Sequence, residues 1–268
     1  MLIDYHTHTY LCKHAEGMPE EYLAQAEAQG LSELGIADHL PWPSGYDPDC
    51  RMNASEFPKY KKIVEELRRK SRKVTVRYAV ELDWVPGKMN EVMTNIRGEE
   101  FDYIIGSIHY IDSFPFDNPN AIPAWKKNSA APDKIWDRYA ELLLDFVDFG
   151  CFDIIGHPDL PKKFGFYPRS MDSFNKKMNE VFELAGKKNM AIEINTSGLR
   201  KPVKEMYPSL ELLKMAKANG MLLSLGSDAH RPQDVASDFP EAIKLADDAG
   251  FDSVVSFNRR APSLVPLG

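Results

Sequence analysis

The sequence lacks any long apolar run, since no stretch approaches the roughly 20 residues that a membrane-spanning helix needs. Its start has neither the basic segment nor the short apolar segment of a secretory signal. Positive charge is also scarce, because 33 Lys and Arg stand against 40 Asp and Glu, for a formal net charge of -7. This balance disfavours a protein that coats nucleic acid or an anionic membrane. We expect a soluble, cytoplasmic protein with a small-molecule substrate.

Cysteine is rare as well. The three cysteines, Cys12, Cys50 and Cys151, are odd in number and form no C-x-x-C pair, which argues against a disulfide framework and against a thiolate zinc site. Reduced thiols suit a cytoplasm. Cys12 lies between two histidines, and it is either a soft metal ligand or a small buried hydrophobe.

No glycine-rich phosphate-binding fingerprint follows the first strand-like run, which weakens a doubly wound dinucleotide-binding fold. Instead, strand-like and helix-like stretches alternate about seven or eight times, the pattern of a parallel sheet closed into a barrel. With 268 residues and 43% hydrophobic composition, the chain suits one α/β domain, a (β/α) barrel over 1–268. The expected strands are Leu2–Tyr5, Leu34–Ala37, Val74–Val80, Tyr103–Ile108, Phe152–Ile155, Ala191–Ile194, Met221–Leu225 and Ser253–Phe257.

The expected helices carry apolar residues at helical spacing, as Ile135, Tyr139 and Leu142 illustrate. A proline and two glutamates at Pro19–Glu21 are typical of a first helical turn. The helices are predicted from Pro19 to near Gly30 and over Phe57–Arg72, Met89–Ile96, Lys134–Phe149, Ser170–Lys187, Leu210–Ala218 and Phe239–Ala249.

The segment Asp112–Pro132 differs from the rest, because it contains four prolines and the exposed-looking aromatic residues Phe114, Phe116 and Trp125. A structureless loop of this length is unusual in a compact domain unless it works as a lid or binding loop. It is therefore either a wall of the substrate pocket or a variable surface loop.

Histidine provides the functional signal. The chain has seven histidines, and six of them close or directly follow apolar, strand-like runs, while His14 lies on the connection that follows His8. His6 and His8 are two residues apart, so in an extended chain they point the same way. In barrels of this kind, chemistry occurs at the C-terminal ends of the strands. The polar residues expected at that end are His6, His8, His39, Glu81, His109, His157, Asn195, Asp228 and His230.

Imidazoles combined with carboxylates are ligands for ions such as Zn, Fe or Mn, whereas magnesium and calcium prefer mainly oxygen. The candidate ligands are too many for one ion. At roughly three to four protein ligands per open catalytic site, they indicate two or three metals with a bridging carboxylate. Such metals lower the pKa of bound water and can clamp a phosphoryl group.

The order of these motifs resembles the polymerase and histidinol phosphatase (PHP) family. That family has a distorted, TIM-like (β/α)7 barrel and a trinuclear metal site at the C-terminal ends of its strands. The resemblance implies His6, His8, Glu81 and Asp228 at the first metal, Glu81 as a bridge with His109 and His157 at the second, and His14, His39 and His230 at the third. It rests on His6-Thr7-His8, His14, Asp38-His39, Glu81, His109, Gly156-His157-Pro158 and Asp228-Ala229-His230.

Two stretches, Gly106–Tyr110 and Gly156–Leu160, resemble the histidinol-phosphatase branch of that family. This implies hydrolysis of L-histidinol phosphate, a phosphomonoester of histidine biosynthesis, with three divalent transition-metal ions. Glu81, Asp228 and His230 would act at the metals.

Residues outside the ligand set have less distinctive patterns. Arg200 is either a catalytic phosphate clamp, since guanidinium binds phosphate in bidentate fashion, or a surface arginine. Asp38 either orients a ligand imidazole or forms a cap or surface salt bridge. Further candidates for substrate binding are Ser197, Lys162, Arg231 and the aromatic residues Tyr110, Trp42, Phe114, Phe116 and Trp125.

Three other functions stay open from the sequence. A metal-dependent amidohydrolase or deacetylase would use a similar barrel without a phosphate clamp. A phosphodiesterase or exonuclease would favour a basic track, against which the net charge of -7 argues. A metal buffer or scaffold would have no need for so many ligands in open loops.

Overall fold

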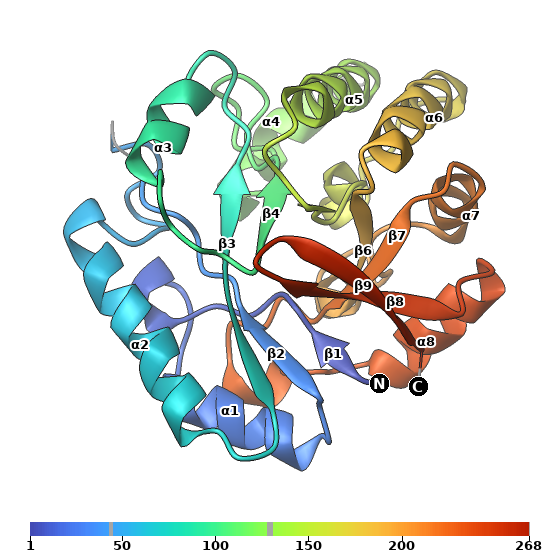
Figure 1. The fold of residues 1–268 in the computed structure, drawn as a ribbon. Coiled ribbons are helices and arrows are strands. Elements are labelled where there is room, and N and C mark those ends of the chain that lie inside the picture. The colour runs from blue at the N-terminus through green and yellow to red at the C-terminus, as the bar shows by residue number, and fades with distance from the viewer. Residues whose placement is uncertain (43–44, 128–130, 268) are drawn as a thin grey trace.

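The computed structural model describes residues 1–42, 45–127 and 131–267, and its central element is a seven-stranded parallel sheet whose strands lie in sequence order (Figure 1). The expected parallel α/β barrel is therefore confirmed. Its strands are β1 Ile3–Asp4, β2 Glu33–Ile36, β3 Thr75–Asp83, β4 Tyr103–Ser107, β5 Ile154–Ile155, β6 Ala191–Asn195 and β7 Leu222–Gly226.

The sheet closes where β1 meets β7. The Tyr5 backbone N–H donates to the Leu225 carbonyl at 3.0 Å, and Thr7 forms a parallel bridge with Ala229. Two strands, β1 and β5, are only two residues long, so the ring is uneven. The distorted seven-stranded barrel follows directly from this pairing.

Helices surround the sheet (Figure 1). In α2, for example, Tyr60, Val64 and Leu67 share one buried face, as helical periodicity requires. The described helices are α1 Pro19–Ala28, α2 Phe57–Lys70, α3 Met89–Asn95, α4 Ile122–Lys127, α5 Ala131–Phe149, α6 Asp172–Lys187, α7 Leu210–Ala218 and α8 Phe239–Asp248.

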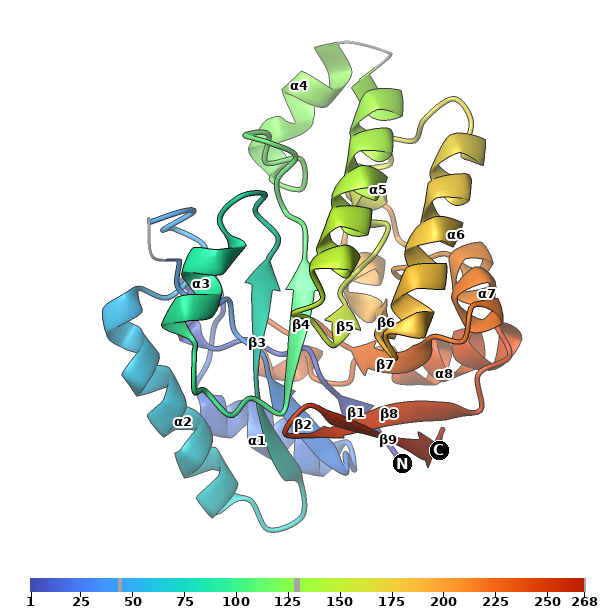
Figure 2. The ribbon, with the colours of Figure 1, turned by 45° about the horizontal axis from the view of Figure 1, so that its top comes forward.

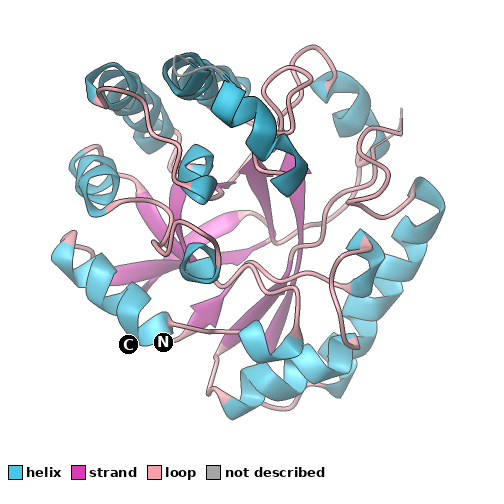
Figure 3. Ribbon diagram, turned by 180° about the vertical axis from the view of Figure 1, so that it is seen from behind, coloured by secondary structure: helices cyan, strands magenta, loops and turns pink. Residues whose placement is uncertain are grey.

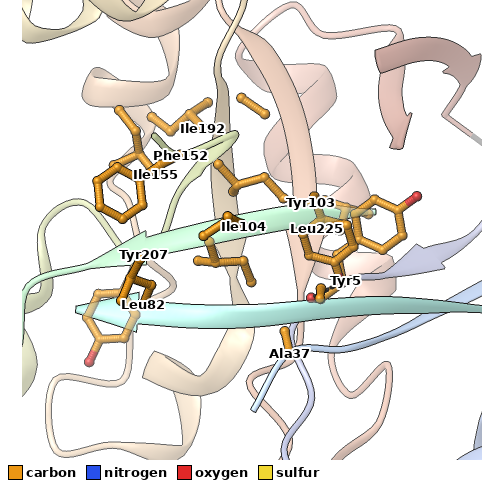
Figure 4. Packing of buried hydrophobic residues seen from close by; sticks show 14 of the residues in the cluster. Tyr5, Ala37, Leu82, Tyr103, Ile104, Phe152, Ile155, Ile192, Tyr207 and Leu225 are labelled. Carbon is orange, nitrogen blue, oxygen red and sulfur yellow. Dashed lines mark hydrogen bonds between the residues drawn. The ribbon is translucent and has the colours of Figure 1, made fainter. Parts of the chain in front are cut away.

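Apolar side chains from the strands fill the core, among them Ile104 of β4, Ile192 of β6 and Leu225 of β7 (Figure 4). Gly106 of β4 shows how closely α5 packs, because a Cβ at this position would lie 1.9 Å from the Phe146 ring. Any larger residue at Gly106 would push α5 off the sheet.

The C-terminal segment differs from expectation. Ser253–Phe257 is not an eighth barrel strand but part of β8 Ser253–Asn258, which pairs antiparallel with β9 Ala261–Pro266. This hairpin lies across one end of the barrel (Figures 1 and 2). The Phe257 N–H donates to the Tyr5 hydroxyl at 3.0 Å. The Ser256 hydroxyl donates to Glu33 at 2.8 Å, and Arg77 of β3 pairs with the same carboxylate at 2.7 Å. The hairpin thus covers the N-terminal ends of the strands and leaves the other end for chemistry.

The proline-rich segment is not structureless in its described part. It contains a short 3₁₀ helix, Pro119–Ala121, followed by α4, while residues 128–130 lie outside the described ranges. Phe116 and Trp125 are buried, the Trp125 indole N–H donates to the Phe116 carbonyl at 2.8 Å, and its ring stacks on Phe166. These aromatic residues form core, not exposed faces for a ligand, because burying their rings anchors the segment.

None of the described helices has both the length and the hydropathy to cross a membrane.

Candidate metal centre

The seven histidines form one group of neighbouring rings. They follow or end the barrel strands, on the side where loops cross the centre of the barrel (Figure 3). Ring centroids lie 5.2 Å apart for His6 and His8, 4.1 Å for His8 and His230, and 4.5 Å for His14 and His230. On the opposite side of the group, the rings of His109 and His157 are 5.2 Å apart. Residues far apart in sequence therefore form one cluster.

Glu81 lies within β3 and is 1% exposed, with imidazoles facing both of its oxygens. Oε2 is 3.3 Å from His6 Nε2 and 3.0 Å from His39 Nδ1. Oε1 is 3.1 Å from His157 Nε2 and 3.5 Å from His109 Nε2. A carboxylate with one oxygen toward each histidine group has the arrangement needed to bridge two ions.

Asp228 supplies the second carboxylate, directly after β7. Its Oδ1 lies 3.3 Å from His8 Nε2 and 3.4 Å from His230 Nδ1. Its Oδ2 accepts a hydrogen bond from the Ser197 hydroxyl at 3.0 Å. All nine residues that the sequence predicts as ligands are thus brought together, and Ser197 joins them.

Many imidazoles are anchored through one nitrogen, which leaves the other free. His14 Nδ1 donates to the Cys12 carbonyl at 2.8 Å, and His230 Nδ1 donates to the Asp228 carbonyl at 3.1 Å. Buried ring nitrogens without a hydrogen-bond partner among the described residues are His6 Nε2, His8 Nδ1 and Nε2, His39 Nδ1, His157 Nδ1 and His230 Nε2.

Unpaired buried nitrogens are costly unless something binds them. Sets of three ligand atoms lie within 4.8 Å of one another, including those of His6, His8 and Glu81 and those of His8, His39 and His230. Imidazole with carboxylate is a suitable donor set for zinc. The residues present therefore fit transition-metal ions.

Two carboxylates that the sequence analysis missed orient the ligand rings. Glu193 of β6 accepts from His6 Nδ1 at 2.6 Å and from the His157 backbone N–H at 2.9 Å. Asp83 of β3 accepts from His109 Nδ1 at 2.6 Å. Carboxylates that hold the second ring nitrogen of a metal-binding histidine fix its tautomer and direction.

Asp38, which the sequence proposed for such a role, is less directly engaged. Its Oδ1 lies 3.6 Å from His8 Nδ1, too long for a hydrogen bond. The same oxygen accepts from the His39 backbone N–H at 2.8 Å, and Oδ2 accepts from the Thr9 hydroxyl. Asp38 therefore fixes the two loops that carry His8 and His39.

The electrostatics of the centre favour bound cations. Burial opposes charge on Glu81, but the rings of His39 and His6 lead the opposing effects that hold its pKa well below the usual value. Burial also opposes charge on His109, yet Asp83 and Glu81 raise the pKa of this imidazole to about 10. A carboxylate that stays ionised beside buried imidazoles describes a site where metal ions can replace protons.

A cavity of about 390 Å³ opens above this cluster. Tyr110 and Ser197, both predicted to bind substrate, line it, and so do Pro115 and Asp117 of the proline-rich segment. That segment therefore forms part of the pocket wall, but its proline and polar residues line the cavity and its buried aromatic residues, Phe116 and Trp125, do not.

Arg200 and Lys162, both candidates for substrate binding, are not among the residues that line this cavity. Arg200 donates to the Ser227 carbonyl at 2.5 Å and lies 3.4 Å from Asp238 Oδ2. Lys162 is buried, with Nζ 2.9 Å from Asp159 Oδ2 and 2.7 Å from the Met206 carbonyl. Both cations are already held by protein oxygens, which the sequence could not show. Arg231 likewise pairs with Asp234 at 3.0 Å.

Comparison with known proteins adds the family. The PHP domain matches residues 4–197, well over half of the chain. The chain belongs to the PHP family. A Deinococcus radiodurans protein named probable histidinol-phosphatase is 35% identical over 260 residues, covering 97% of this chain and 98% of that protein.

Other PHP relatives agree in fold. A Lactococcus lactis protein named histidinol-phosphatase is 24% identical and covers 96% of this chain and 94% of its own. A crystal structure of histidinol phosphate phosphatase from the same organism, described as complexed with Zn, L-histidinol and phosphate, superposes with a TM-score of 0.80 at 22% identity and covers 98% of both chains. The family resemblance inferred from the histidine motifs is confirmed.

Proposed function

We propose that this chain is a metal-dependent phosphomonoesterase that hydrolyses L-histidinol phosphate to L-histidinol and phosphate. The observation that carries the proposal is Glu81 between two groups of imidazoles, beneath a cavity of about 390 Å³. The similarity over nearly the full length to a relative named probable histidinol-phosphatase supports the choice of substrate. Such an enzyme would work on a small molecule in the cytoplasm.

Three divalent transition-metal ions would be held here, zinc being the ion named for the Lactococcus lactis structure and iron or manganese the alternatives. His6, His8 and Asp228 would hold the first, His109 and His157 the second with Glu81 shared, and His14, His39 and His230 the third. Bound ions supply charge stabilisation for the phosphoryl group and lower the pKa of water. Within the chain, Glu193 and Asp83 keep the ligand rings aimed at them.

The phosphate end of the substrate needs a cation from the chain, and Lys201 is the best placed. It lines the cavity, and its ammonium forms no hydrogen bond or ion pair in the part of the chain that the structure describes. Burial lowers the pKa of Lys201, and the nearby Lys163 lowers it further, against the attraction of Asp228. A bound phosphate would supply the missing partner, whereas Lys163 is paired with Asp117 at 3.1 Å.

This assignment gives a direct comparison of two neighbouring cations. Lys201→Ala should lower kcat/KM for phosphomonoesters by about tenfold or more, because a hydrogen bond to a charged group is worth about 1.5–3 kcal/mol. Arg200→Ala should act mainly on the melting temperature, since it loses the contacts to Ser227 and Asp238. Steady-state kinetics on both variants, with metal content measured in parallel, shows which cation binds the phosphate. A larger decrease of kcat/KM in Arg200→Ala than in Lys201→Ala would identify Arg200 as the phosphate-binding residue instead.

The reaction class is tested on one metal-loaded preparation with three substrates, a phosphomonoester, a phosphodiester and an N-acetyl compound. We expect the phosphomonoester to be hydrolysed fastest, because Asp47 and Asp117 line the cavity beside its cations and such carboxylates disfavour a polyanionic backbone. Fastest cleavage of the phosphodiester would favour a nuclease-like PHP enzyme. Preference for the N-acetyl compound would make the chain a deacetylase and reject the proposal.

A further inference from the structure

Two carboxylates that are not proposed metal ligands line the cavity, Asp47 and Asp117. Asp117 Oδ2 already has a cation, the Lys163 ammonium at 3.1 Å. Asp47 differs, because its nearest cation is shared. Arg51 Nη2 lies 2.6 Å from Asp83 Oδ2 but 3.5 Å from Asp47 Oδ2. One guanidinium thus lies between two carboxylates and is closer to Asp83. The negative charge of Asp47 is therefore only partly neutralised, and it faces the cavity.

Asp47 is also held in position. The Tyr110 hydroxyl donates to Asp47 Oδ1 at 2.9 Å, and the Tyr110 ring packs edge-on against Tyr46 with centroids 5.2 Å apart. Tyr110 directly follows His109, so the pair is attached to the metal centre by the chain itself.

Charge and surroundings together indicate what Asp47 binds. A fixed carboxylate beside a tyrosine ring recognises a positively charged N–H donor, through a charge-assisted hydrogen bond and a cation–π contact. Phosphate would be repelled by Asp47, which leaves the organic half of the substrate as its partner.

We propose that Asp47, held by Tyr110 and Arg51, binds the cationic nitrogen of the substrate's organic half and makes the enzyme selective for aminoalkyl phosphates. The inference rests on the proposed function, because histidinol phosphate offers such a nitrogen as its ammonium and, when protonated, as its imidazolium. Asp47 is then a specificity residue, and the metal centre treats all phosphomonoesters alike.

The experiment compares kcat/KM for four monoesters in the metal-loaded enzyme: L-histidinol phosphate, O-phosphoethanolamine, 2-(imidazol-4-yl)ethyl phosphate and ethyl phosphate. Asp47→Asn keeps the shape of the side chain and an oxygen for Tyr110. It should lower the ratio of the cationic ester to ethyl phosphate by about tenfold, the loss expected for one charge-assisted hydrogen bond. If kcat/KM falls for phosphoethanolamine, Asp47 binds the ammonium group. If it falls for the imidazolyl ester, Asp47 binds the imidazolium ring.

Asp49→Asn is the matched control, since Asp49 is an exposed carboxylate two residues away that forms no hydrogen bond or ion pair with described residues. It should leave all four rates unchanged. An unchanged ratio in Asp47→Asn, with metal content equal to that of the parent enzyme, overturns the inference. If the parent enzyme prefers another aminoalkyl phosphate over histidinol phosphate, the proposed substrate is wrong. The ratio of kcat/KM for the cationic ester to that for ethyl phosphate in Asp47→Asn would still test the role of Asp47.

Discussion

Replacing Glu81 with alanine should lower phosphatase activity on the order of 10³-fold, because metal ions contribute several kcal/mol to stabilising phosphoryl transfer. Glu81 is the residue whose two oxygens face both histidine groups, with His6 and His157 at 3.3 and 3.1 Å. Its loss removes a ligand from two proposed ions at once. The five imidazoles within 4 Å of Glu81 would then lose the negative charge that favours cations among them.

The measurement is elemental analysis of protein purified without chelator, beside kinetics. The parent chain should hold more than two ions, and Glu81→Ala should lose more metal than His14→Ala, because His14 belongs only to the proposed third ion. His14 is also exposed, so its removal disturbs the core little. A parent chain with one ion or fewer and full activity would contradict the trinuclear centre.

Glu193→Gln should weaken metal binding by about 10- to 100-fold, the usual cost of losing a carboxylate behind a ligand histidine. Glu193 Oε1 accepts from His6 Nδ1 at 2.6 Å, and Oε2 accepts from the His157 N–H at 2.9 Å. Glutamine has almost the same shape but can donate where Glu193 only accepts, so His6 can adopt the other tautomer. Space is tight here, since a Cβ at Gly226 would lie 2.2 Å from Glu193 Oε1.

A chelator titration followed by zinc back-titration gives the affinity of each variant. Glu183→Gln is the control, because Glu183 lies on the exposed face of α6 and pairs only with Lys187 among described residues. Unchanged zinc affinity in Glu193→Gln, in a protein that still melts cooperatively, would show that His6 needs no orienting carboxylate.

The barrel could be predicted from the sequence because its strands are short apolar runs that alternate with amphipathic helices. The hairpin could not be predicted fully. β9, Ala261–Pro266, begins and ends near prolines and is mostly exposed, so it has no apolar pattern to detect. The part of the proline-rich segment in the pocket wall was among the predictions, but its aromatic residues were wrongly expected to be exposed. Phe116 and Trp125 are buried, and the prolines and polar residues around them in the sequence give no sign of this.

The ligand cluster could be predicted because its members lie near the ends of strands or on the connections that follow, and parallel strands end at one rim. The orienting carboxylates left weaker signals. Glu193 sits in an otherwise apolar strand, and Asp83 lies two residues from Glu81 and so shares its side of the strand. A charged residue in a buried strand is seldom unpaired, which could have identified both. Arg200 and Lys201 are adjacent, and only the tertiary pairing shows which one remains available.

The central claim is that this chain hydrolyses L-histidinol phosphate in preference to other monoesters. The most direct test is kcat/KM for L-histidinol phosphate against p-nitrophenyl phosphate on one metal-loaded preparation. We expect a ratio of at least about 10, which corresponds to about 1.4 kcal/mol of differential transition-state binding. An equal or reversed preference would contradict the substrate assignment and leave a PHP phosphatase that acts on a different ester.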